Sequence, residues 1–584
     1  MAAEAHHAMN GSPRRVGLAA VLIVGTIAVL VRFIYPAADP PWNPGVGIVW
    51  HDEGAWVHNA RNKALFDVWS LDAWNPMYIA PVFTLLEYAS FAAFGVGIRE
   101  ARLVPEVTGI LSILLLGLGV RRLAGRDAAL IAAALLATNY VYVMWNRAAL
   151  MEGPMTAFIV ASWYCYVRAQ QRPWWGALVG VCALLAYFTK ASAAFFVAAL
   201  GVEALIALVA SGATESPTTK SAARATLVGL IAGALVAVAG FVVPNWGEYR
   251  FYNWQMSVTR KPSYTLRAFL DRLTWLPILH DIFTRMWPVL VIGVISSVST
   301  LARWRGVAPG ERLLLLWIGL GALEVLLHDV GNERRFIPFI PALIAIAALV
   351  LGKYRTLVPA ETAAVPLRRA LLGAPIVAYA CYVVAGALVR IAFLYDVRPN
   401  VRLAAVLAAI ATAALYATWP RVPRLLSHGG WSPAAGLLLA AFLCAGDLAQ
   451  YLQWATGRSY KNYDASRALG AILPSGTLVH GKLANGLALE NGIRPVFVGR
   501  GFGNYEDRKR RNDVRYILTY VAPRVGYEGP VIEDVLEAYP NRTIIMTFDV
   551  AETPTGHDRA ALIDKFGTTS PQSPVEGAAR RAQD

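Results

Sequence analysis

The sequence has little charge, few cysteines and fewer acidic than basic residues. Only 16% of its 584 residues are charged, while 57% are hydrophobic. A soluble domain averages about 25% charged residues, so the deficit predicts that most of this chain faces lipid or other apolar helices. The four cysteines, Cys165, Cys182, Cys381 and Cys444, all lie inside apolar runs without a CxxC pair. This argues against a disulfide framework or a zinc site.

The shortage of acidic residues leaves a net charge of +15. In a soluble protein such a charge would suggest nucleic acid as a partner. Here much of the charge sits in short Lys/Arg clusters between apolar runs, as the positive-inside rule predicts for a membrane protein. No basic face with interleaved aromatic residues is present, so nucleic-acid binding is not expected.

Long apolar runs recur along the chain, and each is close to the roughly 20 residues that a membrane span needs. The first, 16–31, follows Arg14 and Arg15 and resembles either a signal peptide or an uncleaved first span. Arg32 and the lack of a small-x-small cleavage site favour the span. The predicted spans, about thirteen in all, are 16–31, 103–121, 127–145, 153–169, 174–190, 191–210, 225–243, 284–303, 312–328, 336–352, 370–394, 401–418 and 431–450.

The basic loops orient these spans. Clusters such as Arg121 with Arg122 and Lys220 with Arg224 fall on one common side, which becomes the cytoplasmic side. The alternation holds only if the apolar stretch 78–97 does not cross. We therefore expect 78–97 to be a helix in the outer interface, since a crossing there would place the later arginine clusters outside.

The character of the chain changes after Gln450. Residues 455–565 alternate a helical stretch with short strand-like stretches, which predicts a small extracytoplasmic α/β domain. The predicted helix is 464–473, and the predicted strands are 477–481, 495–499, 514–520 and 542–550. We expect a transmembrane domain over 1–454 with a first outer loop at 36–102, and a polar, disordered tail at 566–584.

The strongest chemical signal is His51-Asp52-Glu53, in the loop after the first span. Adjacent carboxylates at the outer surface can accept a proton from a hydroxyl or hold a metal ion. The alternative is an ordinary solvated pair in a loop. The neighbourhood favours function, because further polar motifs follow in a fixed order. These are 55–67 as a helical stretch, Trp74-Asn75-Pro76, Phe94-Gly95, Arg102-Leu103 and 146–152 at another outer turn.

This order resembles glycosyltransferase family 39 of the GT-C class, which includes protein O-mannosyltransferases and lipid A aminoarabinose transferases. The resemblance covers roughly residues 45–350 and is weaker beyond. It implies a GT-C fold, a polyprenyl- or dolichyl-phosphate sugar donor and an active site at the outer membrane surface. It implies catalytic roles for Asp52, Glu53 and Glu152. Asn75 departs from the lysine of the aminoarabinose branch, which argues against an aminoarabinose donor.

Transfer of a sugar from a lipid phosphate requires a base for the acceptor hydroxyl and cations for the leaving phosphate. Asp52 suits the first role. The candidates for the second, all predicted near the outer face, are Arg102, Lys190, Arg334 and Arg335. No cofactor is certain; a divalent cation on Asp52 and Glu152 is a further hypothesis.

Two of these cations have structural alternatives. Lys190 sits between two apolar runs, where it is either functional or a lysine that extends its amine to the interface. Arg334 and Arg335 lie outside, against the usual charge bias, so they either contact phosphate or pair with Glu333 or Asp329. The aromatic loop 244–283 is expected to be a membrane anchor or, less often, a sugar-stacking surface. The glycine-rich 499–503 is expected to be a turn.

The sequence therefore predicts a membrane glycosyltransferase with polyprenyl-phosphate-linked sugar as donor and a lipid, glycan or protein as acceptor. We expect it in a bacterial inner membrane, with its site facing the periplasm or exterior. The main alternative is a polytopic lipid or sugar transporter or flippase, although no internal repeat is apparent. A non-catalytic assembly protein is a third hypothesis, and it would not need Asp52.

Overall fold

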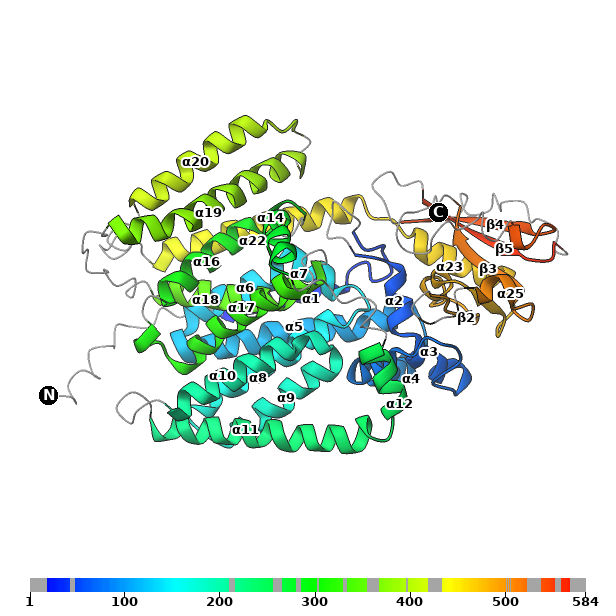
Figure 1. Cartoon of the computed structure of the whole chain (residues 1–584), viewed down its shortest axis with the longest axis horizontal. Coiled ribbons are helices and arrows are strands. Elements are labelled where there is room, and N and C mark those ends of the chain that lie inside the picture. Colours follow the sequence, from blue (N-terminus) through cyan, green and yellow to red (C-terminus); the bar gives the residue numbers. More distant parts are fainter. Residues whose placement is uncertain are drawn as a thin grey trace.

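The computed structural model of the chain combines a large bundle of helices with a small sheet domain at one end (Figure 1). The described residues are 18–41, 48–209, 216–255, 265–279, 285–301, 304–328, 333–353, 367–394, 397–418, 433–499, 502, 504, 506–521, 537–551 and 558–567.

In the described residues, every apolar run predicted as a span is mainly helical. The buried residues of these helices are mainly Ala, Leu, Val and Ile. They are α1 (Leu18–Phe33), α5 (Ile98–Ala124), α6 (Arg126–Thr138), α7 (Tyr140–Asn146), α8 (Glu152–Ala169), α9 (Trp175–Thr189), α10 (Ala194–Val209), α11 (Pro217–Ala237), α16 (Trp287–Leu301), α17 (Pro309–His328), α18 (Ile340–Lys353), α19 (Leu367–Leu394), α20 (Val401–Thr418) and α22 (Pro433–Thr456).

Fewer helices than the thirteen predicted spans are long and apolar enough to cross a membrane. Five helices of the described part are long and apolar enough to cross a membrane by themselves, and six if the bent pair α6–α7 counts as one span. Several other apolar helices, α1 and α9 among them, are shorter. The count of thirteen is therefore not confirmed, whereas the helical membrane architecture is.

The run 127–145 is not one straight helix. It bends by 60° between α6 and α7. Asn139 stands at the break, and its side-chain oxygen accepts a hydrogen bond from the backbone N–H of Tyr142 at 3.0 Å. An asparagine at this position caps the second helix, which explains why the helix restarts here.

The first outer loop is mostly helical. It contains α2 (His51–Trp56), α3 (His58–Phe66), the 3₁₀ turn η2 (Pro76–Tyr78) and α4 (Pro81–Phe94). With 14 residues, α4 is about 21 Å long at 1.5 Å per residue, well short of a hydrocarbon core of about 30 Å. This length agrees with an interfacial helix at 78–97, although its place relative to the membrane stays a prediction.

Short elements fill the other connections. The loop 244–283 is helical over much of its described length, and the segment before α18 forms a 3₁₀ helix. These elements are η3 (Ala191–Ala193), η4 (Val238–Val242), α12 (Trp246–Arg250), η5 (Phe251–Gln255), α14 (Leu266–Leu279), η6 (Trp304–Gly306) and η7 (Glu333–Phe339).

The sheet domain follows α22. Its described strands form one five-stranded sheet in the order β2-β1-β3-β5-β4, in which β1 pairs parallel with β2 and β3 while β5 runs antiparallel to β3 and β4. The strands are β1 (Leu478–His480), β2 (Arg494–Val496), β3 (Tyr516–Tyr520), β4 (Thr543–Val550) and β5 (Asp558–Asp564), and the helices are α23 (Lys461–Ile472), α24 (Lys482–Gly486) and α25 (Asp507–Arg510).

These strands include one that the sequence did not predict. The four predicted strands correspond to β1 to β4, but 495–499 is shorter than expected because β2 ends at Val496. The unpredicted strand is β5, a central strand with six of seven residues buried. The predicted turn at 499–503 and the tail at 566–584 lie largely outside the described residues.

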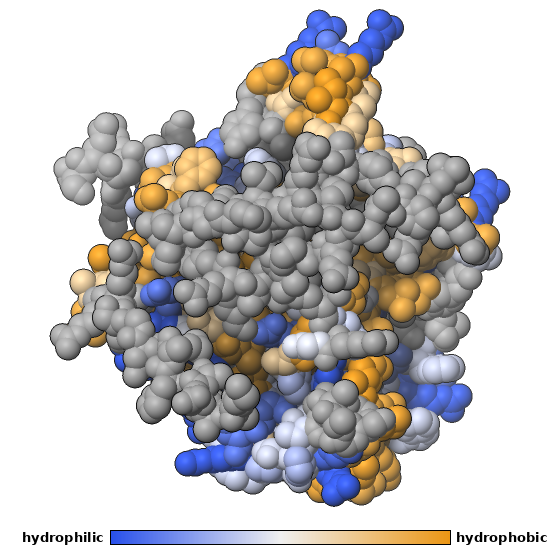
Figure 2. Space-filling view, turned by 90° about the vertical axis from the view of Figure 1, so that its left-hand side faces the viewer, coloured by the Kyte–Doolittle hydropathy of each residue, from blue (hydrophilic) through white to orange (hydrophobic). Residues whose placement is uncertain are grey.

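The end of the bundle opposite the sheet domain carries hydrophilic residues beside hydrophobic flanks (Figure 2). Large apolar side chains are exposed along several helices of the bundle, among them Leu22, Val236 and Phe442. Exposed apolar side chains over the length of a helical bundle are typical of a surface that lipid covers.

Candidate active site

Asp52 lies where three separate parts of the chain meet. It is in the first turn of α2, where an acidic side chain interacts favourably with the helix dipole. Lys482, from α24 of the sheet domain, donates from Nζ to Asp52 Oδ1 at 2.6 Å. Arg334, from η7, donates from Nη2 to Asp52 Oδ2. The first outer loop, the segment before α18 and the sheet domain thus converge on one carboxylate.

The two cations change the acidity of Asp52. Burial alone raises the pKa of the Asp52 carboxyl, but the charges of Arg334 and Lys482 outweigh burial and hold the pKa well below its usual range. Asp52 is therefore fully ionised in this state. A carboxylate that is so strongly stabilised is a weak base, so it must lose part of this pairing before it can accept a proton.

Glu53, the other half of the acidic pair, has a different environment. Arg102 donates from Nε and Nη2 to the two oxygens of Glu53, at 2.8 and 2.7 Å. Glu53 Oε1 also accepts the backbone N–H of Ala149 at 2.8 Å. Both charged side chains are buried, at 3% and 2% exposure. Such a fully bonded, buried pair favours a structural role for Glu53 over a catalytic one.

Arg102 is held by further hydrogen bonds inside the protein. Besides Glu53, it donates from Nη1 to the backbone oxygens of Pro36 and Ala38, at 2.9 and 2.6 Å. It therefore connects the end of the first span to the start of α5 and to α2. The geometry does not favour Arg102 as a phosphate ligand, because phosphate would have to displace these bonds from a buried position.

Glu152 and Lys190 form another pair. Lys190 Nζ donates to Glu152 Oε1 at 2.5 Å, and Glu152 is fully buried at the start of α8. Lys190 thus neither extends freely to the interface nor stands alone. Arg334 lies within electrostatic range of both groups and over the ring of Trp145, so Arg334 links this pair to Asp52.

Arg335 faces away from that linkage. It donates to Glu324 of α17 at 2.8 Å, and both side chains are partly exposed. The expected partners Asp329 and the side chain of Glu333 lie outside the described residues. The two adjacent arginines are thus divided in the structure, since Arg334 contacts Asp52 whereas Arg335 contacts Glu324.

Asn75 and the aromatic loop 244–283 contact each other next to the site. Asn75 accepts from Asn59 at 2.9 Å and donates to the hydroxyl of Tyr252 at 3.1 Å. Trp74 stacks on Phe497 of the sheet domain, with ring centroids 5.1 Å apart, and also contacts Tyr252. Tyr252 therefore serves as packing between domains, while Trp246 and Trp254 are more than half exposed, as an anchoring belt requires.

The hypothesis of a divalent cation finds little support in this geometry. In the described part of the chain, no three His, Cys, Asp or Glu residues gather as a metal site. Asp52 and Glu152 instead contact cationic side chains, an arrangement that does not suit a cation. Metal dependence stays a hypothesis.

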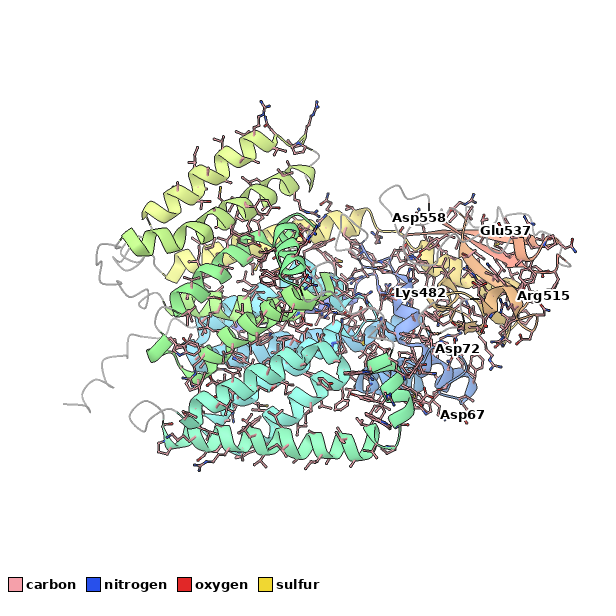
Figure 3. The ribbon with its side chains drawn as sticks, in the orientation of Figure 1. Asp67, Asp72, Lys482, Arg515, Glu537 and Asp558 are labelled. Carbon is pink, nitrogen blue, oxygen red and sulfur yellow. The ribbon has the colours of Figure 1, made fainter. Side chains whose placement is uncertain are left out.

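Sequence reasoning missed Lys482. The residue is 430 positions away from Asp52 and belongs to no motif that suggests chemistry. The signal available was small: a glycine, Gly481, ends a predicted strand, and Lys482 follows it directly. Only the packing of the sheet domain on α2 reveals its partner. Lys482 and Asp72 are labelled in Figure 3, where the first outer loop meets the sheet domain.

The helical bundle with its terminal sheet domain has a fold similar to that of solved membrane-protein structures. The structure of ArnT from Cupriavidus metallidurans bound to undecaprenyl phosphate is similar, with a TM-score of 0.55 and 15% identity over 95% of this chain and 99% of that chain. The apo ArnT structure gives a TM-score of 0.55 and 16% identity, over 94% and 99%. An Archaeoglobus fulgidus oligosaccharyltransferase gives a TM-score of 0.46 and 14% identity, over 86% of this chain and 69% of that chain.

The family comparison agrees with the motifs. Residues 60–251 match the family model of dolichyl-phosphate-mannose-protein mannosyltransferases, so the resemblance to glycosyltransferase family 39 is confirmed. A direct sequence comparison with curated proteins gives no match. The matched segment begins inside α3 and ends at η5, and it includes Arg102, Glu152 and Lys190.

Proposed function

We propose that the chain is a membrane glycosyltransferase that moves a sugar from a polyprenyl-phosphate donor to an acceptor hydroxyl on the extracytoplasmic side. The observation that carries the proposal is the carboxylate of Asp52 between two cations, at the junction of the first outer loop and the sheet domain. A base and phosphate-binding cations are the groups that this reaction needs.

The reaction would be a single displacement. The acceptor oxygen forms a bond to the anomeric carbon as the bond from that carbon to the phosphate oxygen breaks. The hydroxyl proton passes to Asp52, and the polyprenyl phosphate leaves with the bonding electron pair. Negative charge grows on the leaving phosphate, so Arg334 next to Asp52 is placed to stabilise the transition state.

The finer topology belongs to the same proposal. About thirteen spans, with the N-terminus inside and the sheet domain outside, would place Asp52 at the outer surface of a bacterial inner membrane. The basic loops 121–126 and 168–172 support this orientation. Transfer to a lipid, glycan or protein acceptor is compatible with this site, and Asn75 argues against aminoarabinose as the sugar.

Transfer by purified protein tests the proposal. The protein is reconstituted in liposomes with radiolabelled undecaprenyl-phosphate sugars, one sugar at a time, and a membrane extract supplies acceptors. We expect label to move from the lipid to an acceptor with at least one sugar. Movement of intact labelled donor between leaflets without transfer would instead support the transporter or flippase. Binding of donor followed by neither event would contradict both.

A further inference from the structure

A groove in the surface of the helical bundle lies between α1, α5 and α6, which are labelled in Figure 1. Its volume is about 1020 Å³, at the upper end of the range for ligand pockets, about 300–1,000 Å³. Every lining residue except Thr26, Arg121 and Arg126 is apolar. Large side chains of its walls, such as Leu22 and Leu114, are more than half exposed. This lining suits a hydrocarbon chain.

The groove is closed at one end, where α1 meets α5 and α6. A Cβ at Gly109 of α5 would lie 3.1 Å from Nε of Arg32, and Arg32 donates to the backbone oxygen of Ala137 in α6 at 3.1 Å. Further along α1 there is open space. In the described part of the chain, a Cβ at Gly25 would meet nothing within 4 Å. Gly25 therefore faces the groove rather than a neighbouring helix.

The length of the groove matches one leaflet of a membrane. Its lining runs from Leu18 to Leu30 along α1 and from Ile110 to Arg121 along α5. At 1.5 Å per residue these stretches are about 18 and about 17 Å long, close to half of a hydrocarbon core of about 30 Å. The groove therefore fits the acyl chain of a lipid in one leaflet.

Two arginines stand at the other end of the groove. Arg121 is in the last turn of α5 and Arg126 begins α6, and both side chains are exposed. Within the described residues, neither guanidinium has a hydrogen bond or an ion pair. Arg122 does not line the groove and donates to Gln171 at 2.7 Å. Asp127 is the one acidic residue of this loop, so the charge at this end is positive.

This end of the groove is far from the site around Asp52. Arg102, which binds Glu53 next to Asp52, is near the start of α5, and Arg121 is near its end. The stretch of helix between the two arginines is about 28 Å long. Arg121 and Arg126 are therefore not ligands of a phosphate at Asp52. The positive-inside rule predicts that they lie on the cytoplasmic side.

From the shape and charge of this groove we propose that the chain binds an anionic phospholipid. One acyl chain lies between α1, α5 and α6, and the phosphate contacts Arg121 and Arg126. An arginine fork can bind two phosphate oxygens at once, and basic sites between membrane helices are known to bind anionic head groups. The lipid belongs to the leaflet opposite the proposed active site. This inference goes beyond the proposed function and does not rest on it.

The head group is tested by lipid binding to the full-length protein in detergent, measured by native mass spectrometry. Phosphatidylglycerol, which is anionic, is compared with zwitterionic phosphatidylethanolamine that has the same acyl chains. We expect phosphatidylglycerol to bind about 10- to 25-fold more tightly, because each arginine next to an anionic lipid contributes about fivefold. Arg121→Gln and Arg126→Gln should each remove about fivefold of this preference. Arg122→Gln, the matched control from the same loop, should leave the preference unchanged.

The acyl chain is tested by filling the groove. Gly25→Leu should weaken the binding of both phospholipids roughly tenfold, as expected if about two CH₂ groups of the acyl chain lose their contact with the protein. Gly319→Leu is the matched control, because a Cβ at this exposed glycine of α17 would also meet nothing within 4 Å in the described part of the chain. It should leave both affinities unchanged.

The outcomes separate the possible occupants. Equal affinity of the wild type for the two phospholipids would overturn the proposal. An equal loss of preference in Arg122→Gln would also overturn it, because the effect would then come from the net charge of the loop. If undecaprenyl phosphate displaces phosphatidylglycerol and Gly25→Leu prevents this, the groove holds the polyprenyl chain and the phospholipid assignment is wrong. If the glutamine variants do not fold, Arg121→Lys with Arg126→Lys should keep the preference and Gly25→Leu decides.

Discussion

Arg102 binds both oxygens of Glu53 inside the protein, beside the site rather than in it. The adjacent acidic residues of the sequence thus have separate partners: Asp52 faces the cations of the site, whereas Glu53 connects α2 to α5. One acidic dipeptide provides both a reactive group and the attachment that fixes its position.

The first prediction concerns this pair. Glu53→Gln removes the charge that neutralises buried Arg102, and breaking a buried pair costs about 3–5 kcal/mol. We expect a clearly lower melting temperature in detergent, with a donor KM near wild type in the protein that remains folded. Arg102→Lys should behave in the same way, because lysine cannot replace the two-pronged bond. Normal stability with a raised donor KM would show that Arg102 contacts the donor.

The second prediction concerns Lys190 and Glu152. Lys190→Met leaves the fully buried Glu152 without its lysine, so it should destabilise the protein by about 3–5 kcal/mol. The double variant Lys190→Met with Glu152→Gln removes both charges and should recover most of the lost stability. Thermal unfolding of the four proteins in the cycle measures this. A double variant no more stable than Lys190→Met would contradict a pairwise role.

The third prediction concerns the aromatic contact between domains. Trp74 is buried, stacks on Phe497 and donates from Nε1 to the backbone oxygen of Ala55 at 2.5 Å. Trp74→Ala should cost about 3–5 kcal/mol and expose the sheet domain to limited proteolysis. Trp254→Ala is the matched control, because that ring is 60% exposed. Equal protease resistance of both variants would show that Trp74 does not hold the domain.

The fourth prediction is a dependence of stability on pH. Burial, followed by the charge of Lys565, lowers the pKa of His480 in the sheet domain to about 3. An unfolded histidine takes up a proton below about pH 6.5, whereas folded His480 stays neutral. The contribution of neutral His480 to the free energy of unfolding is therefore complete above pH 6.5 and is lost as the pH falls toward 3. Between pH 7.5 and 5, the melting temperature of His480→Leu should fall less steeply than that of wild type; parallel curves would contradict this.

Sequence periodicity located the helices because burial in lipid leaves long apolar runs that few other structures have. It could not show the 60° bend within 127–145, since Asn139 is one polar residue in an apolar run. It also missed β5, whose centre, Ala560-Ala561-Leu562, has residues that favour helices. That segment is a strand because both neighbouring strands pair with it.

The candidate site was predictable in part. Motif order placed Asp52 in an outer loop and Arg334 in another, and the structure brings the two together. Motif order could not show which of Arg334 and Arg335 contacts Asp52, because the direction of two adjacent side chains depends on the turn η7. The role of Lys482 could not be predicted from the sequence, because its contact with Asp52 exists only when the sheet domain packs on α2.

The central claim is that Asp52 takes the proton of the acceptor, and one substitution tests it most directly. Asp52→Asn is compared with wild type in transfer from radiolabelled undecaprenyl-phosphate sugar, with Asp67→Asn, an exposed carboxylate of the same loop, as the control. We predict that Asp52→Asn expresses and inserts normally but loses roughly 10²–10⁴-fold in rate, the usual effect of losing a general base. Retention of more than about a tenth of the wild-type rate, far above that range, would contradict the account.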